Sequence, residues 1–242
     1  MSLTTNLHRR SVPYLIYWIA STEIKTQVKK ALHRLGWNPP KAIAVAEIEV
    51  PDSKIANQAT AYAMELNTPS IFNHVLRTYY YGEMLAQTYG WKRDREAFYL
   101  AAILHDLGIS KRFDSPDQAF ELDGAQAARN FLLTNGQPDE LADLVHEAIA
   151  FHTSVGVADK MSEPEIRLVH IGAGVDVIAY RAEDLHPESI KAVAQELPRL
   201  GFKEEAVRVF SQQAERKPHS PIAGLTALGF PQKIRDNPYF SE

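Results

Sequence analysis

Apolar residues recur at helical spacing through most of this 242-residue sequence, and this periodicity restricts the fold more than any other feature. From Asp52 onward the pattern is that of amphipathic helices, which repeat an apolar position every three or four residues. Thr68-Pro69 is a typical helix start, and Asn135-Gly136 is a typical helix end. No segment predicts a strand with comparable clarity. The sequence therefore predicts an all-α fold.

Further periodic segments predict a series of helices after the one that starts at residue 69. Their approximate ranges are 94–108, 123–133, 138–151, 162–178, 188–197 and 203–215. Ser162 and Glu165 have the spacing of a capping box at the start of one of these helices. The last stretch, which is rich in proline and glycine, is expected to be a tail that wraps the body.

The chain is expected to form one domain with extensions, because 242 residues lie near the upper limit for a single hydrophobic core. Residues 1–50 predict an N-terminal helix, from about Leu7 to Leu35, and a connector, while residues 51–242 predict the main domain with its C-terminal tail. The apolar run from Val12 to Ala20 is too short to span a bilayer. We expect it to be a docking helix that covers the body or makes a homo-oligomer contact, in a cytoplasmic protein without a membrane partner.

Cysteine content and charge narrow the chemistry. The sequence has no cysteine, so disulfides and thiolate ligands are excluded, and any metal must be held by imidazole and carboxylate groups. The formal net charge is only −4 and no Lys/Arg-rich block is present, which argues against a nucleic acid polymer as a partner. A small molecule, including a nucleotide, remains compatible as the substrate.

The dipeptide His105-Asp106 is the most informative pair of residues for chemistry. It follows an apolar helical segment and precedes Gly108. Adjacent helical residues point about 100° apart, so both side chains reach one ion only near a helix end. Gly108 would let the backbone turn away at that point. The pair therefore predicts two metal ligands at the end of a helix.

Two further polar residues interrupt apolar helical faces, His74 upstream and Asp176 downstream. A buried carboxylate must be paired or bound to a cation, because burying it alone is costly. Each residue also has an ordinary structural interpretation. A buried histidine is often a hydrogen-bonded core residue, and Asp176 could pair with Arg77 or Arg181. The order His, His-Asp, Asp along apolar helices is what favours a metal site.

This order resembles the HD-domain metal-dependent phosphohydrolase superfamily, and more narrowly its cyanamide hydratase branch. Residues 72–82 read FNHVLRTYYYG and are similar to that branch's N-H-x-x-R-x-aromatic-Tyr-x-Gly, and residues 104–108 and 151–156 match further segments. The resemblance extends from about Thr68 to the C-terminal tail. It implies an HD-type helical bundle within residues 51–242. The implied metal ligands are His74, His105, Asp106 and Asp176.

The resemblance also bears on the number of metal ions. Superfamily members with two metals, or with iron-based oxygenation, need two further histidines between the His-Asp pair and the last Asp. His152 fits one of these places, but Glu121 stands at the other, so the set of bridging histidines is incomplete and we expect one divalent ion. The alternative is that Glu121 ligates a second metal. Zn²⁺ is favoured, and Mn²⁺, Fe²⁺, Co²⁺ or Ni²⁺ would also suit nitrogen and oxygen ligands. Such an ion lowers the pKa of a bound water to about 7 and supplies hydroxide at neutral pH.

Five other residues are candidates for catalysis or substrate binding. Glu121 and His152 are expected to transfer protons or position the substrate, although Glu121 could equally be an N-terminal charge on a helix. Arg77 lies one turn from the first histidine and could orient a ligand carboxylate or hold a phosphate. Asn73 could bond the backbone or a substrate. Lys217 could close over the pocket, although a solvated turn is the alternative.

Three functions follow from these observations. The first is a metal-dependent hydro-lyase that adds water to a cyanamide-type nitrile and gives urea, although Thr153 stands where that branch often has an acidic residue. The alternative is a phosphohydrolase acting on a nucleotide or another phosphate monoester, which would need cations such as Arg77, Lys111 and Arg112 around the metal. A regulatory protein without turnover is the third, and a complete ligand set argues against it.

Overall fold

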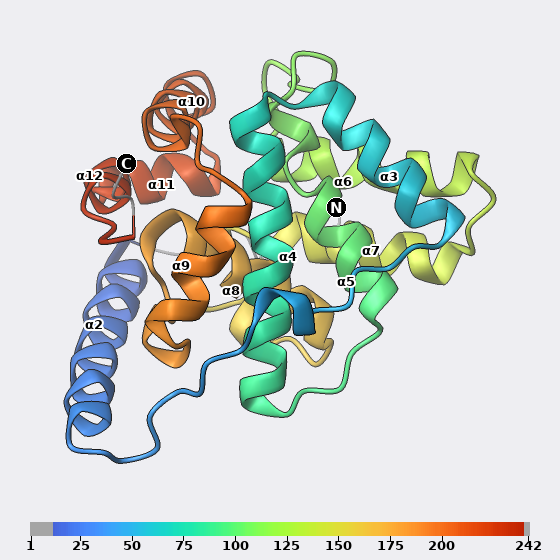
Figure 1. The fold of residues 1–242 in the computed structure, drawn as a ribbon. Coiled ribbons are helices and arrows are strands. Elements are labelled where there is room, and N and C mark those ends of the chain that lie inside the picture. Colours follow the sequence, from blue (N-terminus) through green and yellow to red (C-terminus); the bar gives the residue numbers. More distant parts are fainter. Residues whose placement is uncertain (1–11, 240–242) are drawn as a thin grey trace.

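The computed structural model describes residues 12–239, which form eleven α-helices and four short 3₁₀ helices, with no strand among them. The α-helices are α2 (Val12–Arg34), α3 (Lys54–Leu66), α4 (Pro69–Tyr89), α5 (Arg95–Leu104), α6 (Phe120–Thr134), α7 (Asp139–Phe151), α8 (Pro164–Ile178), α9 (Pro187–Glu196), α10 (Phe202–Arg216), α11 (Pro221–Ala227) and α12 (Phe230–Arg235). The all-α prediction is confirmed. In Figure 1, α4 separates a group formed by α3, α5, α6 and α7 from a second group formed by α2 and α9–α12.

Helix α4 is the central element, and it packs most closely along α8. It begins as the sequence predicts, because the Thr68 side chain accepts a hydrogen bond from the Ile71 amide. It ends at Gly90, whose φ of 65° is left-handed. Gly172 allows the close approach to α8, since a Cβ at this position would overlap the Thr78 carbonyl. The close packing of these two helices fixes the distance between His74 on one and Asp176 on the other.

A second close approach positions the end of α5. The helix ends at Leu104, so His105 is its C-terminal cap and Asp106 leads into a 3₁₀ turn. A Cβ on Gly108 would overlap the Phe120 carbonyl at the start of α6. The backbone does turn at Gly108, and the reason for a glycine there is contact with α6 rather than an unusual φ.

Two predicted helix starts need correction. Helix α6 begins at Phe120, three residues before the predicted start, and Ala119 precedes it without a side-chain cap. The capping box at Ser162 is wrong, because α8 begins at Pro164 and the Ser162 hydroxyl bonds the neighbouring Glu163 carboxylate instead. Both starts lack a capping hydrogen bond from a side chain, which explains why the sequence marks them poorly.

The two ends of the described chain both pack onto the bundle. The C-terminal helices bury a separate apolar cluster that includes Phe202, Phe210 and Ile222 and that reaches α4, α6 and α8. Helix α2 is attached more lightly, through the hydrogen bond of Thr26 to Glu183 and an ion pair of Lys29 with the buried Asp184. The part of the predicted N-terminal helix before residue 12 lies outside the described residues. No helix in the described part has the length and hydropathy that a membrane span requires.

Candidate metal centre

Three buried side chains bring one ligand atom each to a single point in the bundle. Nε2 of His105 lies 3.2 Å from Nε2 of His74. Oδ2 of Asp106 lies 3.5 Å from the first nitrogen and 3.6 Å from the second. A tetrahedral site with bonds of about 2.1 Å has ligand atoms about 3.4 Å apart. The three atoms therefore have the spacing of one face of a tetrahedral site.

The hydrogen bonds of the two histidines place the proton of each neutral ring on the nitrogen that faces away from the other ring. Nδ1 of His105 donates to the Ala102 carbonyl at 2.7 Å, and Nδ1 of His74 donates to Asp176 at 2.7 Å. Each Nε2 then carries a lone pair. Burial and the neighbouring His74 ring lower the pKa of His105 to about 3, so this ring is neutral near pH 7.

The third ligand atom is equally suited to a cation. Oδ2 of Asp106 is buried and accepts no hydrogen bond from any residue between 12 and 239. Burial raises the pKa of the Asp106 carboxyl, and a cation beside it would offset that effect. Two lone pairs and a carboxylate oxygen at this spacing repel one another unless a cation lies between them. The residues present thus fit a divalent ion with nitrogen and oxygen ligands.

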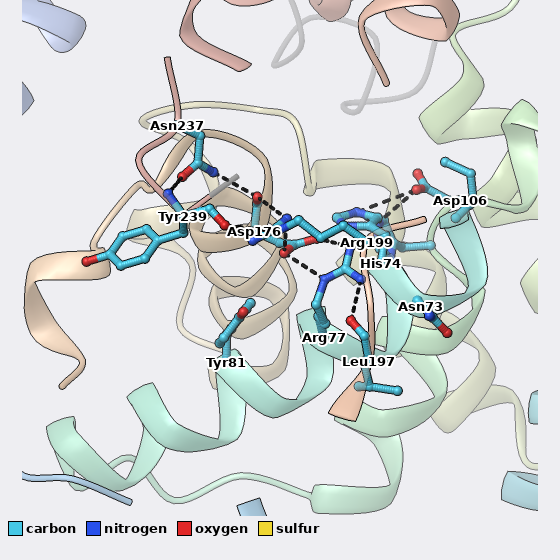
Figure 2. A network of polar contacts seen from close by, with 12 residues as sticks. Asn73, His74, Arg77, Tyr81, Asp106, Asp176, Leu197, Arg199, Asn237 and Tyr239 are labelled. Atoms are coloured by element: carbon cyan, nitrogen blue, oxygen red, sulfur yellow. Dashed lines mark hydrogen bonds and ion pairs between the residues drawn. The ribbon is translucent and has the colours of Figure 1, made fainter. Parts of the chain in front are cut away.

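Asp176 lies on the other side of His74, within a dense ionic network (Figure 2). Arg77 donates to Oδ1 at 2.8 Å and to Oδ2 at 2.9 Å, and Arg199 lies 2.9 Å from Oδ1. Burial alone would raise the pKa of Asp176, but the charges of Arg77 and Arg199 and the bond to His74 outweigh it and hold the pKa well below its usual value. Both carboxylate oxygens are thus engaged by protein groups.

This placement bears on the predicted roles of Asp176 and Arg77. Asp176 is not one of the three residues whose ligand atoms converge, and direct ligation by it stays a prediction. Arg77 is fully buried and bonded to Asp176, and it also donates to the Leu197 carbonyl at 3.0 Å. Its role in orienting this carboxylate stays a prediction. The chain near the C-terminus closes the network, since Asn237 donates to the Asp176 carbonyl at 2.9 Å (Figure 2).

A cavity lies directly against the three converging residues. Its wall is mostly apolar, and no lysine or arginine belongs to it among the described residues. The apolar lining comes from the loop after α7, from α8 and from the C-terminal helices, and it includes Val155, Val177, Ile178, Phe210, Ile222, Leu225 and Phe230. The additional polar side chains of the wall are His152, Thr153, His170 and Tyr180, together with Trp18 from α2.

Trp18 places the N-terminal helix at the cavity. A wider groove between α2 and the C-terminal helices shares Trp18, Tyr180 and Phe230 with the cavity, so the two spaces adjoin there. Gly156, with a φ of 69°, seats the helix, because a Cβ would overlap the Tyr14 hydroxyl and crowd the Trp18 ring. The predicted docking helix thus forms part of the wall beside the metal centre.

His152 contacts the ring of His105, and Glu121 is bonded to Thr153, the residue that follows His152. His152 caps the end of α7, its Nδ1 donates to the Ile149 carbonyl at 2.6 Å, and its ring centre lies 4.9 Å from that of His105. Burial and His105 lower its pKa to about 3. Glu121 does not line the cavity. It accepts a hydrogen bond from Thr153, a residue that belongs to the cavity wall.

Glu121 is a buried carboxyl that forms no ion pair with any residue from 12 to 239. Burial raises its pKa to about 7 against the opposing effect of the Thr153 hydrogen bond. Its Oε2 has no hydrogen-bond partner within the described part of the chain. It also lies in the first turn of α6, so both interpretations made from the sequence apply to its position. A carboxyl with a pKa near 7 is suited to proton transfer near neutral pH.

The two predicted substrate-binding residues lie away from the cavity. Asn73 donates to the Pro198 carbonyl at 2.7 Å. Lys217 is buried, with Nζ 2.7 Å from Asp114 and 3.5 Å from Asp123. Neither side chain belongs to the cavity wall. Contact of these two residues with a substrate stays a prediction.

Sequence reasoning missed several residues that shape the site. His170, a single histidine in the apolar run Leu168–Ile171, carried a signal that could have been noticed. Phe202 stacks on His74 with ring centres 4.6 Å apart, and Arg199 completes the Asp176 network. Trp18 belongs to a helix whose position depends on tertiary packing alone. For the last three, no local pattern marks the role.

Comparison with known proteins agrees with this geometry. Residues 71–171 match the family model described as HD domain, which covers the two histidines and Asp106 and ends before Asp176. Two cyanamide hydratases of Saccharomyces cerevisiae, DDI2 and DDI3, are each 26% identical to this chain over 207 residues. Each alignment covers 84% of this chain and 89% of the relative. The resemblance inferred from the sequence motifs is confirmed.

Proposed function

This chain contains an HD domain, and from that premise we propose that it is a hydratase that adds water to a small uncharged nitrile such as cyanamide, giving urea. The HD domain and the cyanamide hydratase relatives support metal-dependent hydrolase or hydratase activity in general. The choice of a neutral nitrile is our proposal, as is zinc as the ion.

The absence of cationic side chains from the described cavity wall carries this choice. A phosphate monoester brings a charge of about −1.5 to −2, and sites that process it use lysine or arginine to balance that charge. Arg77 is fully buried against Asp176, and Lys111 and Arg112 line a separate surface groove that does not contain the metal ligands. An apolar wall with neutral histidines suits an uncharged molecule instead.

His74, His105 and Asp106 would hold the ion, and a bound divalent ion would supply Lewis acidity and lower the pKa of a water molecule. The remaining chemistry falls to the cavity wall. Adding water to the nitrile forms one carbon–oxygen bond, opens one π bond of the C≡N group, removes a proton from water and delivers a proton to the nitrile nitrogen. The isourea formed gives urea when its hydroxyl proton moves to nitrogen. Nε2 of His152 is an acceptor beside the ligands and can orient the attacking water by accepting a hydrogen bond from it, while a pKa of about 3 keeps the ring neutral.

Glu121 and Thr153 are the residues suited to the proton transfer. With a pKa of about 7, Glu121 is partly protonated near neutral pH. Thr153 belongs to the cavity wall and its hydroxyl is bonded to this carboxyl, so the pair can take the proton released by the attacking water and return it to the nitrile nitrogen. Glu121 ends in its starting state, and the number of protons is conserved. The apolar wall keeps other water away from the reacting carbon.

The test is a paired assay on the protein loaded with zinc, manganese or iron. Urea release is measured with cyanamide, and phosphate release is measured with nucleoside monophosphates and p-nitrophenyl phosphate. We expect metal-dependent urea formation and no phosphate release above that of metal alone. Phosphate release without urea formation would refute the hydratase assignment and establish the phosphohydrolase alternative.

A further inference from the structure

Large apolar side chains are exposed along one face of α2 and in the turn that follows it. Of the ten large apolar residues exposed in the described chain, seven lie between residues 16 and 37: Ile16, Tyr17, Ile24, Val28, Leu32, Leu35 and Trp37. Single residues of this kind are ordinary on a protein surface, whereas a contiguous group marks an interaction site. None of the seven lines the cavity beside the metal centre, so the proposed function does not explain this face.

The exposed face points away from the bundle. Figure 1 shows α2 at the edge of the molecule. On its inner side Leu15 is buried, Trp18 contacts Tyr180 with ring centres 5.4 Å apart, and Thr26 bonds Glu183. The exposed apolar residues lie on the opposite side of the helix, because successive residues turn by about 100°. The helix therefore has two apolar sides, of which one packs on the bundle and the other faces outward.

The width of the outer face indicates the kind of surface that it fits. At about 100° per residue, the arc from Ile16 to Leu32 extends over about 160° around the helix axis. Ser21 and Gln27 are uncharged polar residues within this arc. Pairing with one other helix needs only the narrower seam of a coiled coil. An arc this wide suits a helix that lies on an extended apolar surface.

Cations border the outer face on both sides. Lys25 lies along one border, and Lys30 and Arg34 lie along the other, and all three are exposed. Residues 1–37 contain six of the 26 Lys and Arg of the chain but one of its 30 Asp and Glu, so this segment is basic in a chain with a net charge of −4. Identical cations would meet if two copies packed through this face, whereas anionic lipid headgroups would attract them.

We propose that the outer face of α2 binds the surface of membranes that contain anionic lipid, with the helix parallel to the surface and its inner side still packed on the bundle. Helices of this kind insert their apolar face about 5–10 Å into the headgroup region, while lysine and arginine reach the headgroups. Tyr17 and Trp37, near the two ends of the face, are aromatic residues of the type enriched at membrane interfaces.

The proposal concerns where the protein binds and not what it catalyses, so it does not depend on the hydratase assignment. It departs from the expectation, drawn from the sequence, of a protein without a membrane partner. The helix lies on the membrane and does not cross it.

Sedimentation of the full chain with phosphatidylcholine vesicles, with and without phosphatidylserine, tests the proposal. We expect binding to the mixed vesicles, binding about tenfold weaker or less to phosphatidylcholine alone, and a loss of binding as the salt concentration rises. No binding to the mixed vesicles at low salt would overturn the proposal.

Variants on the outer face locate the contact. Ile24→Ser changes a side chain that is 65% exposed, so the fold should be retained while vesicle binding falls about tenfold. Met64→Ser on α3, where the side chain is 62% exposed, is the matched control and should bind as the wild type does. Lys25→Gln and Lys30→Gln should each weaken binding about fivefold, whereas the exposed Lys54→Gln on α3 should not. Equal binding of Ile24→Ser and Met64→Ser would overturn the proposal.

Trp37 reports the contact directly, because its side chain is 72% exposed in the free protein. Its fluorescence should shift to shorter wavelength on addition of mixed vesicles and be quenched by brominated lipid, and Trp37→Phe should abolish both changes. Unchanged emission from Trp37 in protein that sediments with the vesicles would place the contact elsewhere and overturn the proposal. A dimer that Ile24→Ser dissociates, in a protein that binds no vesicles, would assign the outer face to a second copy instead.

Discussion

Asp106 and Asp176 are both buried carboxylates that approach the same histidine, yet their surroundings differ. Asp106 faces Nε2 of His74 at 3.6 Å and has an oxygen without a hydrogen-bond partner in the described chain. Asp176 faces Nδ1 of His74 at 2.7 Å and is bonded by Arg77 and Arg199 as well. A buried carboxylate needs compensation. The negative charge of Asp176 is balanced by two arginines, whereas the charge of Asp106 requires a bound cation.

Glu121 shows a third way of burying a carboxyl. Among the described residues it pairs with no arginine, and burial raises its pKa to about 7, so it is partly protonated near neutral pH. The charge of a buried carboxyl group is thus compensated in three ways in this chain. Asp106 is suited to a metal ion, Asp176 is bonded by arginines, and Glu121 binds a proton. Each arrangement predicts a different response when its partner is removed.

The largest expected effect concerns the ionic network. Arg77→Met leaves Asp176 short of its main partner and should lower the free energy of unfolding by about 3–5 kcal/mol. Urea denaturation of the metal-loaded protein measures this change. Arg208→Met is the matched control, because the Arg208 side chain is exposed and its pair with Glu205 should contribute only about 0–1 kcal/mol. A loss below about 1 kcal/mol in Arg77→Met would remove the distinction between the two aspartates.

The next effect concerns Glu121 and pH. Its pKa is raised in the folded protein, so the proton it binds stabilises the fold at low pH, and this contribution is lost as the pH rises through about 7. Glu121→Gln cannot ionise. The stability of the variant relative to the wild type should therefore increase by about 2 kcal/mol between about pH 5.5 and about pH 8.

Urea denaturation at the two pH values tests this expectation, with the exposed Glu147→Gln on α7 as the control that should follow the wild type. A difference between Glu121→Gln and the wild type that does not change with pH would mean that Glu121 is ionised throughout.

The smallest expected effect is on zinc affinity, and it tells whether Asp176 binds the ion directly or only orients His74. If Asp176 only orients His74, Asp176→Asn should weaken zinc binding by about 10–100-fold and still allow full loading at high zinc concentration. Competition with a chromophoric chelator measures the affinity. Failure to load at any zinc concentration in the folded variant would establish Asp176 as a direct ligand, as the order of the sequence motif predicts.

Features that depend on local sequence patterns could be predicted from the sequence. Helix α4 was predicted from Thr68-Pro69 and its apolar spacing, and the structure brings His74, His105 and Asp106 together as the motif order indicated. The start of α6 was missed because no side chain caps it. This shift places Glu121 inside the helix rather than before it.

Long-range contacts account for the rest. Arg199 and Asn237 reach Asp176 from segments 23 and 61 residues away in the chain, and no periodicity encodes that meeting. Trp18 reaches the cavity because Gly156 leaves room for its helix. Such positions depend on how whole elements pack, which a single sequence does not display.

The most direct test of the account is the metal content of the wild type and of Asp106→Asn after zinc loading and gel filtration, measured by elemental analysis. The account predicts about one zinc ion per chain in the wild type and no retained zinc in the folded variant, because an uncharged amide replaces the carboxylate whose oxygen the described protein leaves unpaired. Full zinc content in Asp106→Asn, or none in the wild type, would contradict a metal centre at His74, His105 and Asp106.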